Sequence, residues 1–269
     1  MNKYVQENRD LWNKWTPIHV KSDFYDVDGF KAGKITLLKD EIRELGDVSG
    51  KSLLHLMCHF GMDTLSWARL GASVTGVDFS EVAIGEARKL AEELHIPASF
   101  FCCELGQIPP DLEEQFDIAF TSKGVLAWLP DLSVWADAIC RCLRPSGIFY
   151  IMEFHPFADI LDEESEEPTP RVKYPYFNRK RPLSFEGGVT YADADDAVDL
   201  PHHEWPHSIS EIVGSLMQAG LEIEFLHEFG YCTYQSHLFL KHCEDGLWRY
   251  GDAPGQLPLM FSLRASKPL

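Results

Sequence analysis

The sequence predicts an α/β fold, a parallel sheet with helices on both faces, and three observations support this prediction. From Lys51 onward, short apolar runs alternate with amphipathic stretches at least four times, which is the pattern of successive strand–helix units. The connections between these runs are short, as compact α/β units require. Apolar residues make up 45% of the 269 residues and charged residues 25%, as is usual for a globular protein with a core.

The first fifty residues are predicted to form amphipathic helices. Trp12 and Trp15 precede Pro17, which is expected to stop the first of them. Before Gly46, apolar residues recur at helical spacing, namely Leu37, Leu38, Ile42 and Leu45. We therefore expect a single domain over residues 1–269, with residues 1–50 as an N-terminal helical cap.

The central part of the chain supplies most of the predicted strands and helices. Strands are expected at residues 52–57, 72–78, 98–104, 116–122 and 148–154. Helices are expected between them at residues 64–71, 80–95 and 131–143, with Ser80 as an N-cap. Near the C-terminus, Ser208 and Glu211 form an S-x-x-E capping box for a helix at residues 208–220. Two final strands are expected at residues 221–229 and 257–266.

Residues 156–206 interrupt this rhythm and are predicted to be an insertion after the fifth strand. They contain the acidic run DEESEE, several prolines and few apolar residues. Loops of that length are uncommon unless they form lids or binding elements. We expect a surface insertion with a small hairpin around residues 187–193.

The net charge of −18 limits the classes of partner. A strongly negative field repels phosphate backbones, so nucleic acid and anionic membrane surfaces are not expected as partners. The insertion holds 12 acidic and 5 basic side chains, so the excess is densest there. Small neutral or cationic ligands fit this charge best.

The cysteines and the N-terminus predict a cytoplasmic protein. The seven cysteines form no CxxC pair, which indicates neither a disulfide framework nor a cysteine-rich zinc site. No run approaches the roughly 20 apolar residues that span a bilayer. The charged N-terminus lacks the apolar stretch of a signal peptide. The oligomeric state is left open.

Residues at the ends of the predicted strands are the first candidates for a binding site. In open α/β sheets, ligands bind beyond the carboxyl ends of the strands. The first strand leads into residues 57–61, the second ends at Asp78, the third at Glu104, and the fourth at Thr121 and Ser122. A carboxylate after the second strand is placed to accept both hydroxyls of a ribose.

The order and spacing of five segments resemble class I S-adenosylmethionine-dependent methyltransferases. These segments are LLHLMCHFG, VTGVDFS, FFCCELGQIP, FDIAFTSKGVLAWLPD and LRPSGIFYIMEFHP, and the resemblance covers roughly Lys51 to His155. The flanking regions are similar to a bacterial subgroup of small-molecule methyltransferases with a CHFG first loop. The resemblance implies a Rossmann-like sheet, S-adenosylmethionine as cofactor, and methyl transfer to a small molecule.

The resemblance also implies roles for individual residues in cofactor binding. Asp78 would hold the ribose, with Phe79 beside the adenine. Glu104 and Leu105 would meet the adenine edge and face. The methionine part would lie along Cys58, His59 and Gly61 and be closed by Thr121, Ser122 and Gly124.

The first loop departs from the family pattern. The positions that usually carry an acidic residue and three glycines are here His55, Met57, His59 and Gly61. Glycines there allow the backbone to approach the ligand closely, so we expect a reshaped methionine pocket. His59 is a candidate hydrogen-bond donor to the cofactor carboxylate; alternatively, it is a partly buried histidine bonded to backbone.

A second pattern, HExxH at residues 203–207, matches the zinc metalloprotease signature. That chemistry needs both histidines on one face of a helix, with the glutamate as general base. Pro206 disrupts such a helix, and Ser208 begins a new one. No metal site is therefore predicted.

Several residues after the fourth and fifth strands are candidates for the acceptor side. They are Lys123, Trp128, Glu153 and His155. His155 is the candidate general base because histidine has a near-neutral pKa; alternatively, it pins its loop through a backbone bond. Aromatic residues of the insertion, with Tyr191 as the substrate-binding candidate, would cover the acceptor. Trp12, Trp15 and His19 would fold over the cofactor, unless these aromatics simply form a small core.

Two other functions are compatible with the same strand-end pattern. A nicotinamide-dependent dehydrogenase also uses an acidic residue after the second strand, but the sequence has no GxGxxG loop. A cofactor-binding protein without methyl transfer would explain the loss of glycines. In each case the expected small-molecule partner is not polyanionic.

Overall fold

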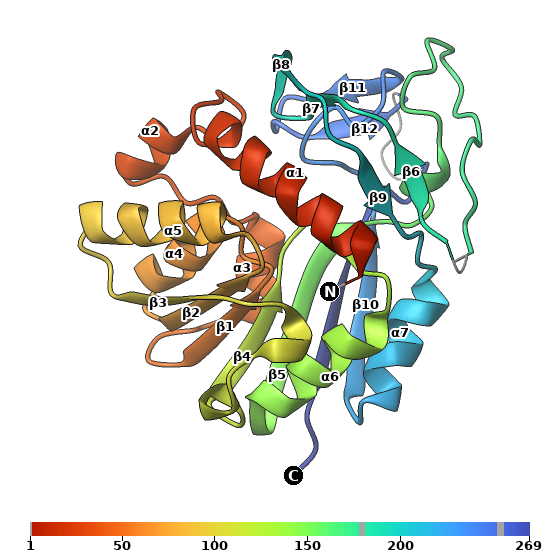
Figure 1. Ribbon diagram of the computed structural model, residues 1–269. Coiled ribbons are helices and arrows are strands. Elements are labelled where there is room, and N and C mark those ends of the chain that lie inside the picture. The colour runs from red at the N-terminus through yellow and green to blue at the C-terminus, as the bar shows by residue number, and fades with distance from the viewer. Residues whose placement is uncertain (1, 178–180, 252–255) are drawn as a thin grey trace.

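The centre of the molecule is a seven-stranded sheet with helices on both faces (Figure 1). The computed structural model describes residues 2–177, 181–251 and 256–269. The strands lie in the order β10 (Glu222–Phe229), β13 (Met260–Ser266), β5 (Leu143–Phe154), β4 (Phe116–Thr121), β1 (Ser52–Leu56), β2 (Ser73–Asp78) and β3 (Ala98–Cys102). The predicted α/β class is confirmed.

The sheet is mixed, whereas the sequence pattern predicts a parallel one. Strands β1 to β5 pair in parallel, but β13 runs antiparallel to both β5 and β10. The described residues between β10 and β13 form no helix, and antiparallel neighbours need no crossover helix. The last strand therefore returns directly between its two partners.

The four helices predicted after Lys51 begin within two residues of the expected positions 64, 80, 131 and 208. The described helices are α1 (Lys3–His19), α2 (Val27–Lys31), α3 (Lys39–Leu45), α4 (Met62–Arg69), α5 (Glu81–Glu93), α6 (Leu132–Cys142) and α7 (Ile209–Gln218). The Ser80 side chain accepts from the Ala83 N–H, and Ser208 and Glu211 form the predicted capping box. Short 3₁₀ turns occur at η1 (Leu105–Gln107), η2 (Pro110–Leu112), η3 (Leu126–Trp128) and η4 (Ala158–Ile160).

Helix α1 continues past Pro17, so the predicted stop there is wrong. Pro17 lacks the N–H that would bond to the carbonyl of Asn13, but it lies in the last turn, where one missing bond is tolerated. The helix ends at His19, which is fully buried, and Trp15 is nearly so. Burial of these two rings offsets the lost hydrogen bond.

Apolar side chains fill both sides of the sheet. Trp135, Ile139 and Leu216 pack from α6 and α7 on one face, and Trp67 packs with Phe120 on the α4 face. Figure 1 shows α4 and α5 on the opposite side of the sheet from α6 and α7. This packing holds the strand ends, and the loops that follow them, in place.

Helix α1 and the predicted insertion together cover the edge of the sheet at the carboxyl ends of β1, β2 and β4 (Figure 1). The Asn8 side chain donates to the His203 carbonyl at 2.7 Å and accepts from the His203 N–H at 2.8 Å. The insertion contains β6 (Leu183–Phe185), β7 (Gly188–Thr190), β8 (Asp193–Val198) and β9 (His202–Glu204). The β7–β8 pair confirms the predicted hairpin, while the division into one domain, a cap and an insertion stays a prediction.

A further hairpin, β11 (Leu240–His242) with β12 (Trp248–Tyr250), lies between β10 and β13 in the sequence and was not predicted. It packs near the insertion through a small core that includes Leu161, Cys232 and Phe239. The hairpin thereby helps to enclose the space above the sheet.

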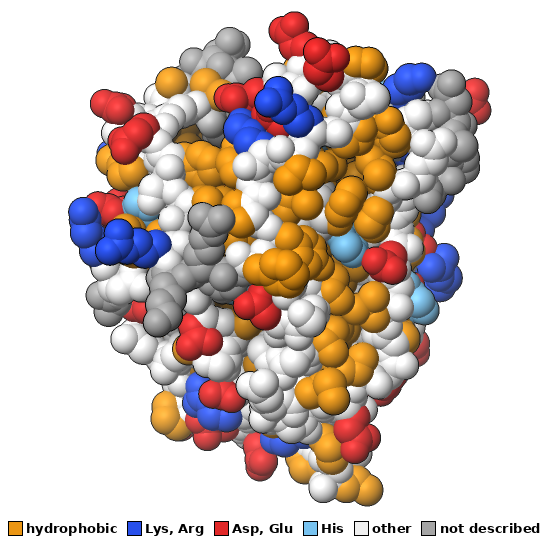
Figure 2. Space-filling model, turned by 90° about the vertical axis from the view of Figure 1, so that its right-hand side faces the viewer, with side chains coloured by type: hydrophobic (Ala, Val, Ile, Leu, Met, Phe, Trp, Pro, Cys, Tyr) orange, Lys and Arg blue, Asp and Glu red, His pale blue; other side chains and the backbone are white. Residues whose placement is uncertain are grey.

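The surface mixes hydrophobic and acidic side chains. Figure 2 shows a band of hydrophobic side chains on one side of the molecule, with Asp and Glu side chains scattered around it. Exposed apolar residues of this kind are common on folded proteins. None of the described helices is long and apolar enough to cross a membrane.

Candidate active site

The register of the sheet brings three strand ends to the same level. Leu56 lies opposite Val77 on one side and Thr121 on the other, so β1, β2 and β4 end together. A cavity of about 1470 Å³ opens above these ends, beneath α1 and the insertion. Sites for one small ligand typically measure about 300–1,000 Å³, so this cavity has room for two.

Most of the predicted binding residues line this cavity. They are Cys58, His59, Gly61, Asp78, Phe79, Ser122, Gly124, Trp128 and Tyr191. The structure places four others outside its walls, namely Glu104, Leu105, Thr121 and His155. These predicted residues therefore share one cavity, and the direction of each side chain decides which of them face it.

The loop after β1 keeps left-handed turns without the usual glycines. Met57 has φ of 59° and His59 has φ of 51°, and Gly61 follows with φ of 82°. A left-handed conformation costs an L-residue roughly 1–2 kcal/mol, so this loop is strained. Its side chains line the cavity, as expected if the methionine pocket is reshaped.

Gly61 is held in a position that no larger residue fits. A Cβ there would lie 2.9 Å from the Phe100 ring and 3.0 Å from the Ala87 Cβ. We expect Gly61→Ala to lower the free energy of unfolding by about 2–4 kcal/mol, from the left-handed backbone and the overpacking together. Urea denaturation measures this loss. Gly85→Ala, in open space on α5, is the matched control and should be neutral or stabilising by up to about 1 kcal/mol.

Asp78, at the end of β2, joins the first loop to the second strand. Its carboxylate accepts from the His59 N–H at 2.8 Å and from the Ser80 N–H at 2.9 Å. Burial raises the pKa of Asp78 to about 6, although the backbone N–H groups act in the opposite direction. The carboxylate lines the cavity and is ionised at neutral pH, ready to accept hydroxyl groups.

His59 lies among aromatic rings of the N-terminal cap. Its ring centroid is 5.1 Å from that of Trp12, 5.2 Å from His19 and 5.6 Å from Tyr25. Burial holds the pKa of His59 well below its usual value, so the ring is neutral at pH 7. As a neutral side chain, His59 offers a hydrogen bond and no charge to a ligand.

His55 replaces the usual acidic residue and joins a short hydrogen-bond chain. Its Nε2 lies 3.0 Å from the Ser122 hydroxyl, and its Nδ1 lies 2.8 Å from the Thr64 hydroxyl. Burial lowers the pKa of His55 to about 4, so one ring nitrogen donates and the other accepts. The chain orients Ser122 at the cavity wall.

A buried charge cluster lies beside the first loop, and sequence reasoning missed most of it. The Lys123 ammonium lies 3.2 Å from Glu41 and 3.6 Å from Asp63. Burial alone would raise the pKa of Asp63, but Lys123 holds it below its usual value. Asp63 in the first turn of α4 was visible in the sequence, whereas its pairing with Lys123 required the folded chain.

Glu153 clamps the loop that follows β4. Its buried carboxylate accepts from four backbone N–H groups: those of Gly124, Val125 (2.8 Å), Leu126 (3.2 Å) and Phe154 (2.7 Å). Burial raises its pKa, and these bonds oppose the shift. Glu153, predicted on the acceptor side, thus positions the loop that carries Trp128.

The structure does not support the predicted general base at His155. Its Nδ1 accepts from the Phe157 N–H at 3.0 Å, and its Nε2 donates to Glu228 at 2.9 Å. The side chain is 5% exposed and lies outside the cavity. With both nitrogens engaged, His155 matches the alternative interpretation, in which it pins its own loop.

The other three predicted residues outside the cavity face the interior or start a turn. The Thr121 hydroxyl accepts from the Trp135 indole at 3.3 Å and is fully buried. Leu105 packs in the core beneath α6, and Glu104 directly precedes η1 without a side-chain capping bond. Alternation along β4 points Thr121 away from the cavity while Ser122 faces it.

The aromatic residues divide between lid and core. Trp12, Trp128 and Tyr191 line the cavity, with Trp12 and Trp128 in contact at 5.1 Å between ring centroids. Trp15 and His19 are buried behind them. Trp15 and His19 thus match the interpretation as a small core, while a role of Trp12, Trp128 and Tyr191 in covering a ligand stays a prediction.

The HExxH pattern does not form a helical metal site. His203 lies on β9, with its Nε2 2.8 Å from Glu7 and its Nδ1 2.9 Å from Ser184. His207 donates to the Leu129 carbonyl at 2.7 Å. Among the side chains that the structure describes, no group of three His, Cys, Asp or Glu residues is arranged to hold a metal.

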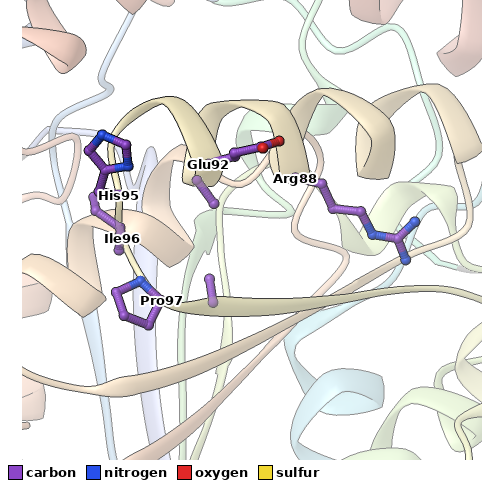
Figure 3. Close-up of a pocket in the computed structure, with 7 residues that line it drawn as sticks. Arg88, Glu92, His95, Ile96 and Pro97 are labelled. Carbon is purple, nitrogen blue, oxygen red and sulfur yellow. The ribbon is translucent and has the colours of Figure 1, made fainter.

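A second hollow of about 450 Å³ lies between α5 and the start of β3 (Figure 3). The Arg88 guanidinium bonds the Phe100 carbonyl at 2.5 Å. Figure 3 shows the side chains of Arg88, Glu92 and His95 without a common point of convergence. This hollow lies at the opposite edge from the strand ends, so the large cavity is the candidate site.

Comparisons with known proteins agree with this geometry. Residues 53–147 match a family model described as a methyltransferase domain. A ubiquinone biosynthesis O-methyltransferase from Nitrobacter winogradskyi is 31% identical over 147 residues, which cover 55% of each chain. An S-adenosylmethionine-dependent methyltransferase structure from Mesorhizobium loti has a TM-score of 0.57 at 17% identity, covering 88% of this chain and 100% of that one. A glycopeptide N-methyltransferase solved with S-adenosylmethionine has a TM-score of 0.56 at 16% identity, covering 86% and 87%.

The fold and the matched segment agree with each other. Residues 53–147 match a methyltransferase domain, and the sheet that contains them has the order β3-β2-β1-β4-β5-β13-β10. The chain covers about half the length of the curated relatives it matches, from 42% to 58%. The resemblance to the subgroup with a CHFG first loop stays a prediction.

Proposed function

We propose that this protein transfers a methyl group from S-adenosylmethionine to a small-molecule acceptor. The observation that carries the proposal is Asp78, which is bonded to the first loop and faces a cavity with room for two ligands. Methyl transfer is an in-line displacement, so the protein must align the two ligands and exclude water. The roof formed by α1 and the insertion suits that task.

The residues at the strand ends fit the cofactor. Asp78 would accept the ribose hydroxyls, and Phe79 would lie beside the adenine. Asp63 and Lys123 offer opposite charges to the methionine ammonium and carboxylate, which compensates for the missing acid at His55. When bound, the cofactor supplies a methyl group on a positively charged sulfur.

The remaining cofactor contacts belong to the same proposal. They are Cys58, His59 and Gly61 along the methionine, and Ser122 and Gly124 at its end. Trp128 and Tyr191 would contact the acceptor. The side chains of Glu104, Leu105 and Thr121 would have to turn toward the cavity, or act through their backbone, to take part.

A thermal-shift comparison tests the proposal against its alternatives. We expect S-adenosylhomocysteine to raise the melting temperature and NADH to leave it unchanged, because Met57 and His59 crowd the space that a pyrophosphate needs. Stabilisation by NADH alone would instead support a dehydrogenase. Cofactor binding without turnover over a broad acceptor panel would support a non-catalytic binding protein.

The cellular compartment and the atom that accepts the methyl group are two further parts of the proposal. All seven cysteines are free thiols, which fits a reducing compartment, so a cytoplasmic location is part of the proposal. The relatives include an O-methyltransferase and an N-methyltransferase by name. Because these names differ in the methylated atom, the acceptor has to be sought in the cavity itself.

A further inference from the structure

Two opposite charges line the cavity next to the first loop. The Lys123 ammonium and the Asp63 carboxylate both belong to its wall, and they lie 3.6 Å apart. Lys123 follows β4, and Asp63 lies in the first turn of α4. At this distance the two groups attract each other but are too far apart for a hydrogen bond. Each therefore keeps hydrogen-bonding capacity for a ligand in the cavity.

Glu41 on α3 holds Lys123 from outside the cavity. Its side chain is 0% exposed and does not belong to the cavity wall. Its two carboxylate oxygens lie 3.2 and 3.3 Å from the Lys123 ammonium, closer than the carboxylate of Asp63. Glu41 is itself held in place, because it accepts from the Leu38 N–H at 2.6 Å. Lys123 thus has a fixed, buried partner on one side and the cavity on the other.

Asp63 has a comparable anchor in Thr36. The Thr36 hydroxyl donates to one carboxylate oxygen of Asp63, and the Lys123 ammonium lies near the other oxygen. Thr36 and Glu41 both precede residues 53–147, the segment that matches the methyltransferase domain. Residues from the N-terminal part of the chain therefore hold both of the charged groups that this segment presents to the cavity.

Loss of Glu41 would allow the two cavity charges to neutralise each other. Burial alone would lower the pKa of Lys123, but the charges of Glu41 and Asp63 raise it, so the side chain stays an ammonium. This ammonium sits on a flexible stem of four carbons, so it can move from one carboxylate to another. Without Glu41, the nearest carboxylate is Asp63. A closed pair of Lys123 and Asp63 would leave neither charge for a ligand.

A pair of opposite charges held slightly apart is complementary to a zwitterion. The amino-acid end of S-adenosylmethionine carries an ammonium and a carboxylate on the same carbon. Asp63 would accept from that ammonium, and Lys123 would donate to that carboxylate, so both contacts would be charge-assisted. The adenine and the ribose carry no charge. The amino-acid end is therefore the part of the cofactor that depends on how this pair is held.

We propose that Glu41 is a positioning residue for cofactor binding, which holds Lys123 apart from Asp63 so that the pair recognises the amino-acid end of S-adenosylmethionine. This inference rests on the proposed methyl transfer. Glu41 acts through Lys123 and does not touch the cofactor. Its loss should weaken the binding of ligands that carry the amino-acid end and spare ligands that lack it.

Two ligands that differ only at this end test the inference. S-adenosylhomocysteine carries the amino acid, whereas 5′-methylthioadenosine has a methyl group on the same sulfur. In calorimetric titrations of the wild-type protein, we expect S-adenosylhomocysteine to bind at least tenfold more tightly. Glu41→Gln should weaken the binding of S-adenosylhomocysteine at least tenfold and leave the affinity for 5′-methylthioadenosine unchanged. A merely structural role of Glu41 would lower both affinities together.

Glu44→Gln is the matched control on the same helix. The Glu44 side chain is 6% exposed, and it bonds Tyr150 and His227, which do not line the cavity. This substitution also removes a buried carboxylate from α3, and it should leave both affinities unchanged. Loss of the preference for S-adenosylhomocysteine in Glu44→Gln as well would overturn the specific role of Glu41.

A second variant covers the case in which Glu41→Gln does not fold. The double variant Glu41→Gln/Lys123→Met removes both charges of the pair, which is tolerated better than leaving one of them buried alone. It should also lose the preference for S-adenosylhomocysteine. A preference that persists in either variant, or that the wild-type protein lacks, overturns this inference alone. Failure of the wild-type protein to bind either ligand contradicts the proposed function instead.

Discussion

Replacing Asp78 with alanine is expected to weaken the binding of S-adenosylmethionine and S-adenosylhomocysteine at least tenfold. The carboxylate at the end of β2 would accept the ribose hydroxyls, and each charge-assisted hydrogen bond contributes about 1.5–3 kcal/mol. The substitution also frees the N–H groups of His59 and Ser80, so the first loop loses an anchor. Isothermal titration calorimetry at pH 8 measures the loss.

The pH dependence of the same affinity gives an independent check. The pKa of Asp78 is raised to about 6, so below that pH the carboxyl is mostly protonated. Because the cofactor would bind the ionised form, its binding below pH 6 releases a proton from Asp78. The affinity for the cofactor should therefore fall by up to about tenfold per pH unit below 6. Asp78→Ala should remove this dependence, whereas Glu81→Ala, at an exposed carboxylate nearby, should keep it. Full affinity in Asp78→Ala would mean that the ribose lies elsewhere.

Replacing Glu153 with alanine is expected to lower the free energy of unfolding by about 3 kcal/mol. The carboxylate accepts from four backbone N–H groups, and an unsatisfied buried donor costs roughly 1–3 kcal/mol. The loss in the free energy of unfolding stays below the sum of the four bonds. The loop relaxes partly, and the substitution also removes a buried charge. Urea denaturation with a constant m-value reports this difference.

Comparing substitutions separates the effect of losing the four hydrogen bonds of Glu153 from the effect of losing its negative charge. Glu153→Gln keeps one accepting oxygen and should cost less than Glu153→Ala. Glu228→Ala removes an exposed carboxylate that bonds His155 at 2.9 Å, and it should cost under about 1 kcal/mol. A Glu153→Ala protein as stable as the wild type would show that the loop after β4 does not depend on this carboxylate.

Local signals predicted much of the fold. The caps at Ser80 and Ser208 depend on side chains and N–H groups three residues apart, so the sequence alone contains them. The strand pattern likewise depends on neighbouring residues. Two features depended instead on packing: the continuation of α1 past Pro17, and the direction of β13. Burial of His19 and the pairing of β13 with β5 involve residues distant in the chain.

The candidate site likewise combines features that the sequence predicts with features that depend on folding. Asp78, Ser122 and the residues of the first loop follow strand ends, so their meeting was predictable from the order of the strands. The direction of each side chain could not be predicted from that order, which is why the side chains of His155 and Thr121 lie outside the cavity. Both were predicted from their place in the chain, and each hydrogen-bonds a side chain that does not line the cavity: Glu228 for His155 and Trp135 for Thr121.

The sequence by itself determined the α/β fold and the edge of the sheet at which the strand-end residues meet, because periodicity, caps and strand-end motifs are local properties. Only the tertiary structure decided which charges meet. It paired Lys123 with Glu41 and Asp63. These carboxylates come from separate elements, and whether a charge is neutralised depends on neighbours that only folding brings within a few ångströms.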